Sequence, residues 1–597
     1  MGNGLKLRKD IEVKYKWDTE KMYLDTQSWN KEFEYVKIES VKLKDFEGKL
    51  DKKENILNYL LAYEGLSRKV KKLYVYANMR SHEDTSNTEF QGLSSRIESF
   101  YAQFASYVSF FEPEILAKDE RKFMSMIRNT KSLKIYEFLF LDIFKEKPHV
   151  LTKEIEEILA SVSDCLSAPE NIYGILTNAD IDFDSIEDKD GNLIELTEGS
   201  YGNYIRSRDR VLREKAFKSL FKTYRKYENT ISTSLTSSLK AYIFSAKTRK
   251  YKNSLDAALS PSNIPLEVYY NSVKTINNNL DLLHRYVGLK KKLLGLSEMH
   301  MYDLYVPVVD IEREKIQYED ALEIVKEGIK PLGDEYISIF NEGVEKRWID
   351  VYENKGKRSG AYSSGMYDTM PYVLLNYNHD LNDVSTLAHE MGHSIHSYYS
   401  RKTQPYMYAS YTIFSAEIAS TTNEILLIND LINKETDKSK KLYLVNQELE
   451  QIRTTVYRQL MFAEFELLTH EAIENGEALT AKEYNDMWIE LNQRYFGPEM
   501  IVDKDIEVEW ARIPHFYSDF YVYQYATGYA AASAFAKSIL LGKENAIDDY
   551  KGFLKAGGSK YPIDAIKEAG VDMTSSKPLE DTLDRFKELL DILEKLI

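Results

Sequence analysis

The segment LAHEMGHSIH at residues 387–396 has the residue types and the spacing of a metal site. His389 and His393 are four residues apart, so on a helix they lie one turn apart on one face and can bind a single ion through their imidazoles. Glu390 would lie beside that ion, where its carboxylate can take a proton from a water that the metal acidifies. His396 is turned off the shared face and is interpreted as structural. The alternative for the whole segment is an ordinary helix with charged decoration.

A third ligand must come from elsewhere, because a catalytic zinc takes three protein ligands and keeps one position for water. Glu417 is the candidate: it lies 24 residues beyond His393, in a helix predicted over 413–432. Glu424 follows seven residues later on the same face and is predicted to accept the free N–H of a ligand histidine. Solvated positions on an ordinary helix are the alternative for both glutamates.

The aromatic segment IPHFYSDFYVYQYATGYAAASAFAK at 513–537 is the predicted source of hydrogen-bond donors to a transition-state oxyanion. It begins with His515. If 517–529 is helical, three tyrosines share one face: Tyr521, Tyr525 and Tyr529. An aromatic stripe that belongs to the core is the alternative.

Helices dominate the elements that must position these residues. Apolar residues recur at three- and four-residue spacing over 52–80, 86–112, 209–248, 316–346, 440–475 and 579–597. Asn382 and Asp383 are predicted to cap the helix that carries the histidines, which should run to about Tyr399.

Strand patterns are confined to two regions. Residues 181–205 alternate around Asp190-Gly191, which predicts a hairpin, and 361–380 predicts a small sheet with an exposed edge. We therefore expect an N-terminal helical lobe at 1–200 and a larger catalytic domain at 201–597.

The composition narrows the class of protein. Of the 597 residues, 43% are hydrophobic and 29% charged, which is typical of a soluble globular chain large enough for two lobes. The net charge of −16 disfavours nucleic acid and anionic membranes as partners. Cys165 is the only cysteine, and no stretch of about 18 apolar residues occurs, so a cytoplasmic location is expected.

Beyond the HEMGH segment, the chain resembles oligoendopeptidase F, of the thimet-like zinc oligopeptidases. The resemblance extends over most of the chain and is carried by six segments in the expected order: YVYANMRSHEDTSN (74–87), MHMYDLYVP (299–307), GAYSSGMYDTMPYVLLNY (360–377), HEMGHSIHSYYSRKTQPY (389–406), FSAEIASTTNE (414–424) and ARIPHFYSDFYVYQYATGYAAA (511–532).

The resemblance implies a mainly α, zincin-like fold: a two-lobed helical shell around a deep substrate channel, with a small sheet beside the zinc-binding helices. It implies one Zn²⁺ per chain, held by His389, His393 and Glu417, with Glu390 as general base. It also implies short unstructured peptides as substrates, cut at internal bonds, and a strand near 360–366 that pairs with the substrate backbone. His515 and Tyr521 match oxyanion- and substrate-contacting positions.

The resemblance leaves open which of Tyr521, Tyr525 and Tyr529 contacts the oxyanion. Cleavage preference and oligomeric state are not readable from the sequence. Two other functions are weighed against the endopeptidase: a non-catalytic helical peptide-binding protein with structural zinc, and a dipeptidyl carboxypeptidase on a similar fold. The latter needs a group such as Arg512 to hold a terminal carboxylate.

Overall fold

A computed structural model describes residues 5–309 and 315–597 of the chain, which form two compact units. The first unit combines Met1–Lys147, Arg313–Asp430 and Phe535–Gly570; the second combines Pro148–Glu312, Leu431–Ala534 and Val571–Ile597. Each unit therefore joins segments far apart in the sequence. The expected boundary between 1–200 and 201–597 stays a prediction.

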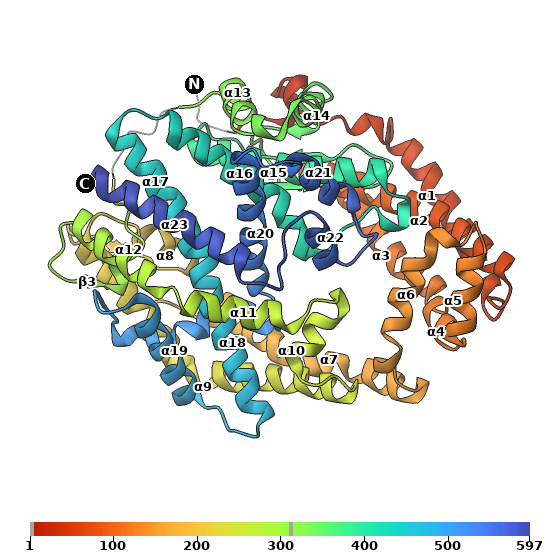
Figure 1. Cartoon of the computed structure of the whole chain (residues 1–597), viewed down its shortest axis with the longest axis horizontal. Coiled ribbons are helices and arrows are strands. Elements are labelled where there is room, and N and C mark those ends of the chain that lie inside the picture. The colour runs from red at the N-terminus through yellow and green to blue at the C-terminus, as the bar shows by residue number, and fades with distance from the viewer. Residues whose placement is uncertain (1–4, 310–314) are drawn as a thin grey trace. The chain divides into compact units, whose positions relative to one another are not determined.

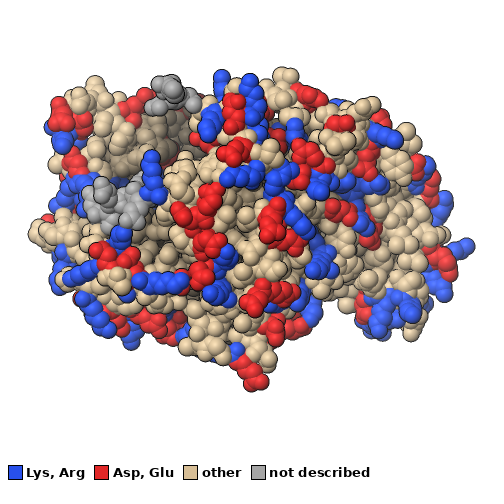
Figure 2. All heavy atoms as spheres, turned by 90° about the horizontal axis from the view of Figure 1, so that it is seen from above, with Lys and Arg blue, Asp and Glu red and all other residues tan. Residues whose placement is uncertain are grey.

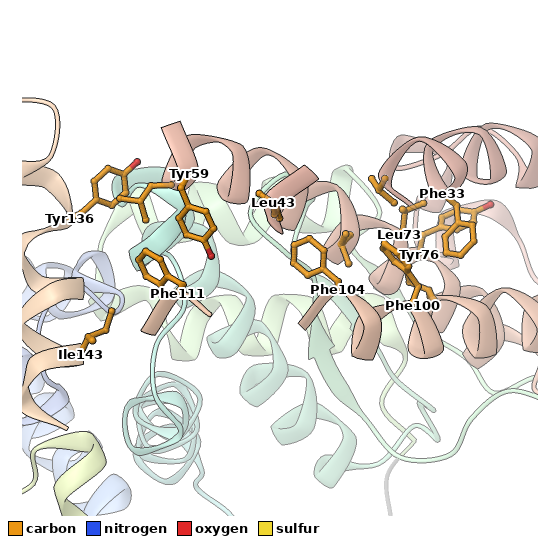
Figure 3. Close-up of a cluster of buried hydrophobic side chains, with 14 of the residues drawn as sticks. Phe33, Leu43, Tyr59, Leu73, Tyr76, Phe100, Phe104, Phe111, Tyr136 and Ile143 are labelled. Carbon is orange, nitrogen blue, oxygen red and sulfur yellow. The ribbon is translucent and has the colours of Figure 1, made fainter. Parts of the chain in front are cut away.

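The first unit begins with a group of helices around an aromatic core. Its helices are α1 (Thr26–Ser40), α2 (Lys53–Glu83), α3 (Thr88–Val108), α4 (Phe111–Leu116), α5 (Glu120–Asn129) and α6 (Glu137–Lys145). The sequence pattern predicts the two long helices α2 and α3, and the structure shows that they pack side by side (Figure 1). Aromatic side chains from several of these helices pack together in one buried hydrophobic cluster (Figure 3). Tyr372 and Leu374 belong to the same cluster. That core thus anchors the strand that carries these two residues.

This strand, β6 (Tyr372–Leu374), is the middle of a three-stranded sheet. It pairs in parallel with β4 (Ile349–Asp350) and antiparallel with β5 (Tyr362–Ser364), so β5 is an edge. The prediction of a small sheet with an exposed edge over 361–380 is confirmed. Buried Asp350 is ion-paired with Arg8 and with Lys357, the latter at 2.7 Å, and these cations hold its pKa below the usual value against the opposing effect of burial.

The rest of the first unit is helical. It contains α13 (Tyr318–Gly328), α14 (Asp334–Glu345), α15 (Leu381–Thr403), α16 (Ile413–Lys434) as far as Asp430, α21 (Ala546–Ala556) and α22 (Pro562–Glu568). The single helix predicted over 316–346 is wrong: Pro331 lies in a 3-10 turn and Gly333 has φ +88°, which divides it in two.

Helix α15 begins earlier than predicted. Its N-cap is Asp380, which accepts from the Asp383 backbone N–H in a capping box, so the predicted cap at Asn382-Asp383 is corrected. Helix α16 covers the predicted 413–432 segment with small shifts at its ends.

The second unit is built mainly from helices, several of them long. They are α7 (Lys153–Ile175), α8 (Glu198–Tyr204), α9 (Arg210–Thr248), α10 (Ser254–Leu259), α11 (Leu266–Asn277), α12 (Leu280–Leu293), α17 (Lys438–Ile452), α18 (Arg458–Glu474), α19 (Ala481–Phe496), α20 (Tyr523–Leu540) as far as Ala534, and α23 (Lys577–Leu596). A π-helical turn at Arg453–Tyr457 joins α17 to α18, so the predicted 440–475 helix is continuous but irregular.

Only short strands occur among the described residues of this unit. The hairpin predicted near Asp190-Gly191 is confirmed: β1 (Ile186–Glu187) pairs antiparallel with β2 (Leu193–Ile194), and Gly191 has φ +82° in the turn. Strands β3 (Met299–His300) and β7 (Met500–Ile501) pair in parallel.

The chain is mainly α with small sheets, as expected. On the face shown in Figure 2, basic and acidic side chains are interspersed. Within the described ranges, no helix is both long enough and apolar enough to cross a membrane.

Candidate metal centre

Three predicted metal ligands converge within the first unit. The Nε2 atoms of His389 and His393 are 3.2 Å apart, and Glu417 Oε2 lies 3.5 Å and 3.7 Å from them. Bond lengths of about 2.0–2.1 Å in tetrahedral geometry place ligand atoms roughly 3.3 Å apart. The three atoms therefore have the separations of ligands to one zinc-sized ion, and among the described residues they are the group of this kind that could hold a metal.

A close approach of two helices brings the third ligand to the histidines. A Cβ at Gly392 of α15 would lie 2.6 Å from Ser420 Cα and 2.8 Å from Ala419 O of α16, so only glycine fits there. Buried Asn423 of α16 donates to Ala388 O of α15 at 3.0 Å. Since Gly392 is one residue before His393, the contact between the helices and the metal centre form together.

Glu424 contacts the outer nitrogen of the first histidine. Its Oε2 lies 3.3 Å from His389 Nδ1, and its other oxygen accepts from Ser385 at 3.3 Å. An acceptor at Nδ1 holds a proton on that nitrogen, so Nε2 is the nitrogen that faces Glu417 and His393 and is available to bind a metal ion. Glu424 therefore lies beside His389, and its role in orienting that ligand stays a prediction.

The electrostatics of the centre favour a cation. Burial disfavours the charged form of His389, but the hydrogen bond and the charge of Glu424 outweigh it and raise its pKa to about 9. Burial, and then the charge of His389, lower the pKa of His393 to about 3. The carboxylates around the two imidazoles therefore favour one positive charge at this point, the sign that a metal ion supplies.

Glu390 lies beside the three ligand atoms without being one of them. It is buried, and its Oε2 has no hydrogen-bond partner among the described residues. Burial raises its pKa to about 7, although the charge of His389 and the backbone N–H of Ser363 on β5 oppose this. A carboxyl group with that pKa can both accept and release a proton near neutral pH.

His396 does not join the cluster. It is buried and its ring stacks on Tyr411 at 3.7 Å, with Phe553 of α21 against it. Its placement agrees with the structural interpretation.

The aromatic residues predicted to stabilise the oxyanion lie in the second unit. The rings of His515, Tyr521 and Tyr525 form a cluster, with centroids 5.5 to 6.4 Å apart. Helix α20 begins only at Tyr523, so Tyr521 precedes it and the predicted single helical face is wrong. Tyr529 is on the helix but buried in the core of this unit.

Sequence reasoning missed the support beneath that cluster. Phe520 has φ +54°, rare for a phenylalanine, and its backbone N–H donates to buried Glu466 at 2.6 Å. Glu466 lies on α18, near His470 and Asp519, which are 3.3 Å apart. The available signal was a pair of ionisable residues, Glu466 and His470, inside an apolar helical stripe.

Arg512 is already engaged within the second unit. Its Nε donates to Glu198 at 3.0 Å, and its guanidinium carbon lies 4.9 Å from the ring centre of Tyr201. Arg512, the example of a carboxylate-holding group named for the dipeptidyl carboxypeptidase hypothesis, is therefore paired with Glu198.

Two family profiles match the sequence. One, described as Peptidase family M3, covers residues 203–585; the other, described as Oligopeptidase F, covers residues 114–183.

Curated relatives match over nearly the whole length. Oligopeptidase PepF of Bacillus subtilis is 47% identical over 100% of this chain and 89% of its own. Group B oligopeptidase PepB of Streptococcus agalactiae is 39% identical over 99% of this chain and 98% of its own length. Among solved structures, oligoendopeptidase-F from Enterococcus faecium has a TM-score of 0.73 at 36% identity, covering 96% of this chain and 99% of that one.

Proposed function

The chain belongs to peptidase family M3 and is a metallo-oligopeptidase, and from this premise we propose that it cuts internal bonds of short, unstructured peptides at one zinc ion. The observation that carries the proposal is the convergence of His389, His393 and Glu417, with ligand atoms 3.2 to 3.7 Å apart. Three ligands suit a catalytic ion, since a structural zinc site closes with a fourth. Zinc fits a His₂Glu donor set, which other divalent ions also fit.

A zinc ion at these atoms would supply a Lewis acid that polarises the scissile carbonyl and acidifies water. Glu390 takes the proton of the attacking water on its carboxylate and delivers it to the leaving amine. Its raised pKa, about 7, suits both transfers. Edge strand β5, which reaches Glu390 at Ser363, offers unpaired backbone groups along which an extended peptide can lie.

We further propose that His515 and Tyr521 donate hydrogen bonds to the oxyanion, with Tyr525 assisting. The resemblance to oligoendopeptidase F supports the first two, and the ring cluster supports their acting together. A cytoplasmic location is proposed from the single cysteine.

The test is Glu390→Gln in the zinc-loaded enzyme with a quenched fluorescent peptide. The variant should keep its zinc and fold but lose turnover by about 10²- to 10⁴-fold, the contribution of a general base. Glu353→Gln, at an exposed position of the same unit, is the matched control and should retain activity. Near-normal hydrolysis by Glu390→Gln would refute the assigned base.

Product mapping by mass spectrometry separates the two alternative functions. Internal cuts that persist on a peptide with a blocked C-terminus exclude the dipeptidyl carboxypeptidase. Peptides that bind but remain uncut with zinc restored would favour the non-catalytic binding protein.

A further inference from the structure

A pocket of about 570 Å³ lies in the first unit, next to the end of strand β5. Tyrosines of α2 and α3 form one wall, Tyr74 and Tyr101, whose rings are 5.8 Å apart. Ser364 and Gly365, at the end of β5, form another, and the last turns of α15 with the following chain complete it. The pocket therefore adjoins the strand that is expected to hold the substrate.

Two cations line this pocket without an acidic partner. Arg401 of α15 makes no ion pair among the described residues, and its Nη1 is shielded from solvent with no hydrogen-bond acceptor. Lys71 of α2 has only an aromatic contact in the described part of the chain, with Nζ 5.1 Å from the ring centre of Tyr406. By contrast, Arg68, one turn earlier on α2, is ion-paired with Asp368.

The surroundings penalise both positive charges. Burial lowers the pKa of Arg401 to about 10. Burial and then the charge of Arg401 lower the pKa of Lys71. Two uncompensated cations facing one cavity destabilise the protein unless an anion neutralises them.

The backbone is shaped to admit the guanidinium. Gly365 has φ +137°, and a Cβ there would lie 2.8 Å from Arg401 Nη1 and 2.6 Å from Met370 O. Any side chain at this position would displace Arg401, so the glycine keeps the cation against the end of the strand.

The pocket is connected to the metal centre on two sides. Ser363, beside Glu390, is two residues from Gly365, a distance of roughly 7 Å along an extended strand. On the other side, Tyr411 of the pocket wall donates to His393 O at 3.4 Å and contacts Ser397 Oγ at 2.9 Å. A peptide lying on β5 with its scissile bond near Glu390 therefore reaches the pocket within two to three residues.

We propose that Arg401 and Lys71 form a carboxylate subsite, which binds an acidic side chain or the terminal carboxylate of the peptide substrate two to three residues from the scissile bond. The proposal rests on the proposed peptidase function. A planar guanidinium matches a carboxylate in two-point geometry, and the lysine adds a second charge. The tyrosine walls suit the apolar remainder of the same substrate residue.

The test compares matched peptides in the zinc-loaded enzyme. One peptide is neutral, and others carry a single Glu two or three residues before or after the cleaved bond. Two further peptides have their C-terminus two or three residues after that bond, one as a free carboxylate and the other as an amide. The wild-type enzyme should prefer one carboxylate position by about 10- to 100-fold in kcat/KM, mainly through KM, as for a hydrogen bond to a charged group. The peptide whose kcat/KM rises shows whether the subsite binds an acidic side chain or the terminal carboxylate.

Arg401→Met should remove this preference and leave cleavage of the neutral peptide within about twofold of wild type. Lys71→Glu should reverse it, favouring a peptide with Lys at the same position, and so tests the subsite even if the arginine variant folds poorly. Lys402→Met and Lys72→Met are the matched controls, since Lys402 is exposed and Lys72 packs on Tyr23 at 4.5 Å outside the pocket.

Equal effects of Arg401→Met and Lys71→Glu on acidic and neutral peptides would overturn the subsite, as would a wild-type enzyme indifferent to carboxylates. Failure of the wild-type enzyme to cut any of the peptides would instead refute the proposed function. In that case, a fluorescence assay measures the affinity of the acidic and neutral peptides for the wild-type protein and the same variants. The subsite is supported if the wild-type protein prefers the acidic peptide and the variants lose or reverse that preference.

Discussion

The contact of Glu424 with Nδ1 of His389 shows how one residue orients the metal-binding nitrogen of another. Glu424 accepts from Nδ1 and so directs Nε2 at Glu417. Glu424→Gln replaces a charged acceptor with a neutral amide, and zinc affinity should fall by about 10- to 100-fold. Competition with a chelating dye measures this. Unchanged affinity would show that the contact does not tune the ligand.

For single residues, the sequence could predict which side chains share a helix face, because that depends only on their spacing along the chain. Two histidines four apart, and two glutamates seven apart, define faces of their own helices. Asn423 was not predicted, because its amide bonds to Ala388 O on another helix, and that pairing has no local pattern. The strained Phe520 escaped for the same reason.

Among the elements, α15 and α16 meet where a side chain would not fit. Gly392→Ala places a Cβ 2.6 Å from Ser420 Cα, so the helices must separate. We expect a loss of about 1–3 kcal/mol in unfolding free energy, typical of overpacking, together with weaker zinc binding. Urea unfolding and metal analysis test both.

Gly552→Ala on α21 is the matched control. Its Cβ would meet nothing within 4 Å, and the position is exposed. Alanine should therefore leave stability unchanged or raise it by up to about 1 kcal/mol. A Gly392→Ala variant as stable as this control would contradict the tight contact.

Edge strand β5 is held by a histidine that resists protonation. His82 Nδ1 lies 2.7 Å from Tyr362 Oη, and its Nε2 is 2.8 Å from Arg358 Nη1. Burial, and then the charge of Arg358, lower its pKa from 6.5 to about 4. The unfolded chain therefore binds a proton near pH 6.5 and the folded chain only near pH 4, so stability falls as the pH drops through this interval.

His82→Gln should lose less stability than the wild-type protein between pH 7 and 4, because the substituted residue does not titrate. Urea unfolding at several pH values measures the difference. Parallel pH profiles of the two proteins would rule out His82 as a contributor.

Helices were predictable wherever periodicity ran unbroken, as in α2 and α9. The prediction failed where backbone chemistry overrode it: Pro331 and Gly333 divide 316–346, and Tyr521 precedes α20. Apolar spacing reports which face is buried and does not mark where a helix stops.

For the whole molecule, all three ligand atoms belong to the first unit. Zinc binding should therefore stabilise that unit, by about 2.7 kcal/mol when free zinc is a hundredfold above its Kd. Removing the ion with a chelator should speed hydrogen exchange in α15 and in α16 as far as Asp430, and much less in α9 or α19. Equal acceleration in both units would contradict this localisation.

The composition of the units could not be predicted from the sequence. The first unit joins Met1–Lys147, Arg313–Asp430 and Phe535–Gly570, three segments that are far apart in the sequence. Contacts between such distant segments depend on complementary surfaces, which periodicity does not encode.

The first unit is assembled from three separate segments of the chain, so it cannot be completed until the last of them has been translated. A ribosome that has just released α15 has already produced the histidines, but α21, whose Phe553 supports His396, is still to be translated. The first unit is therefore completed only after residue 570 has emerged, and until then His396 lacks its contact with Phe553.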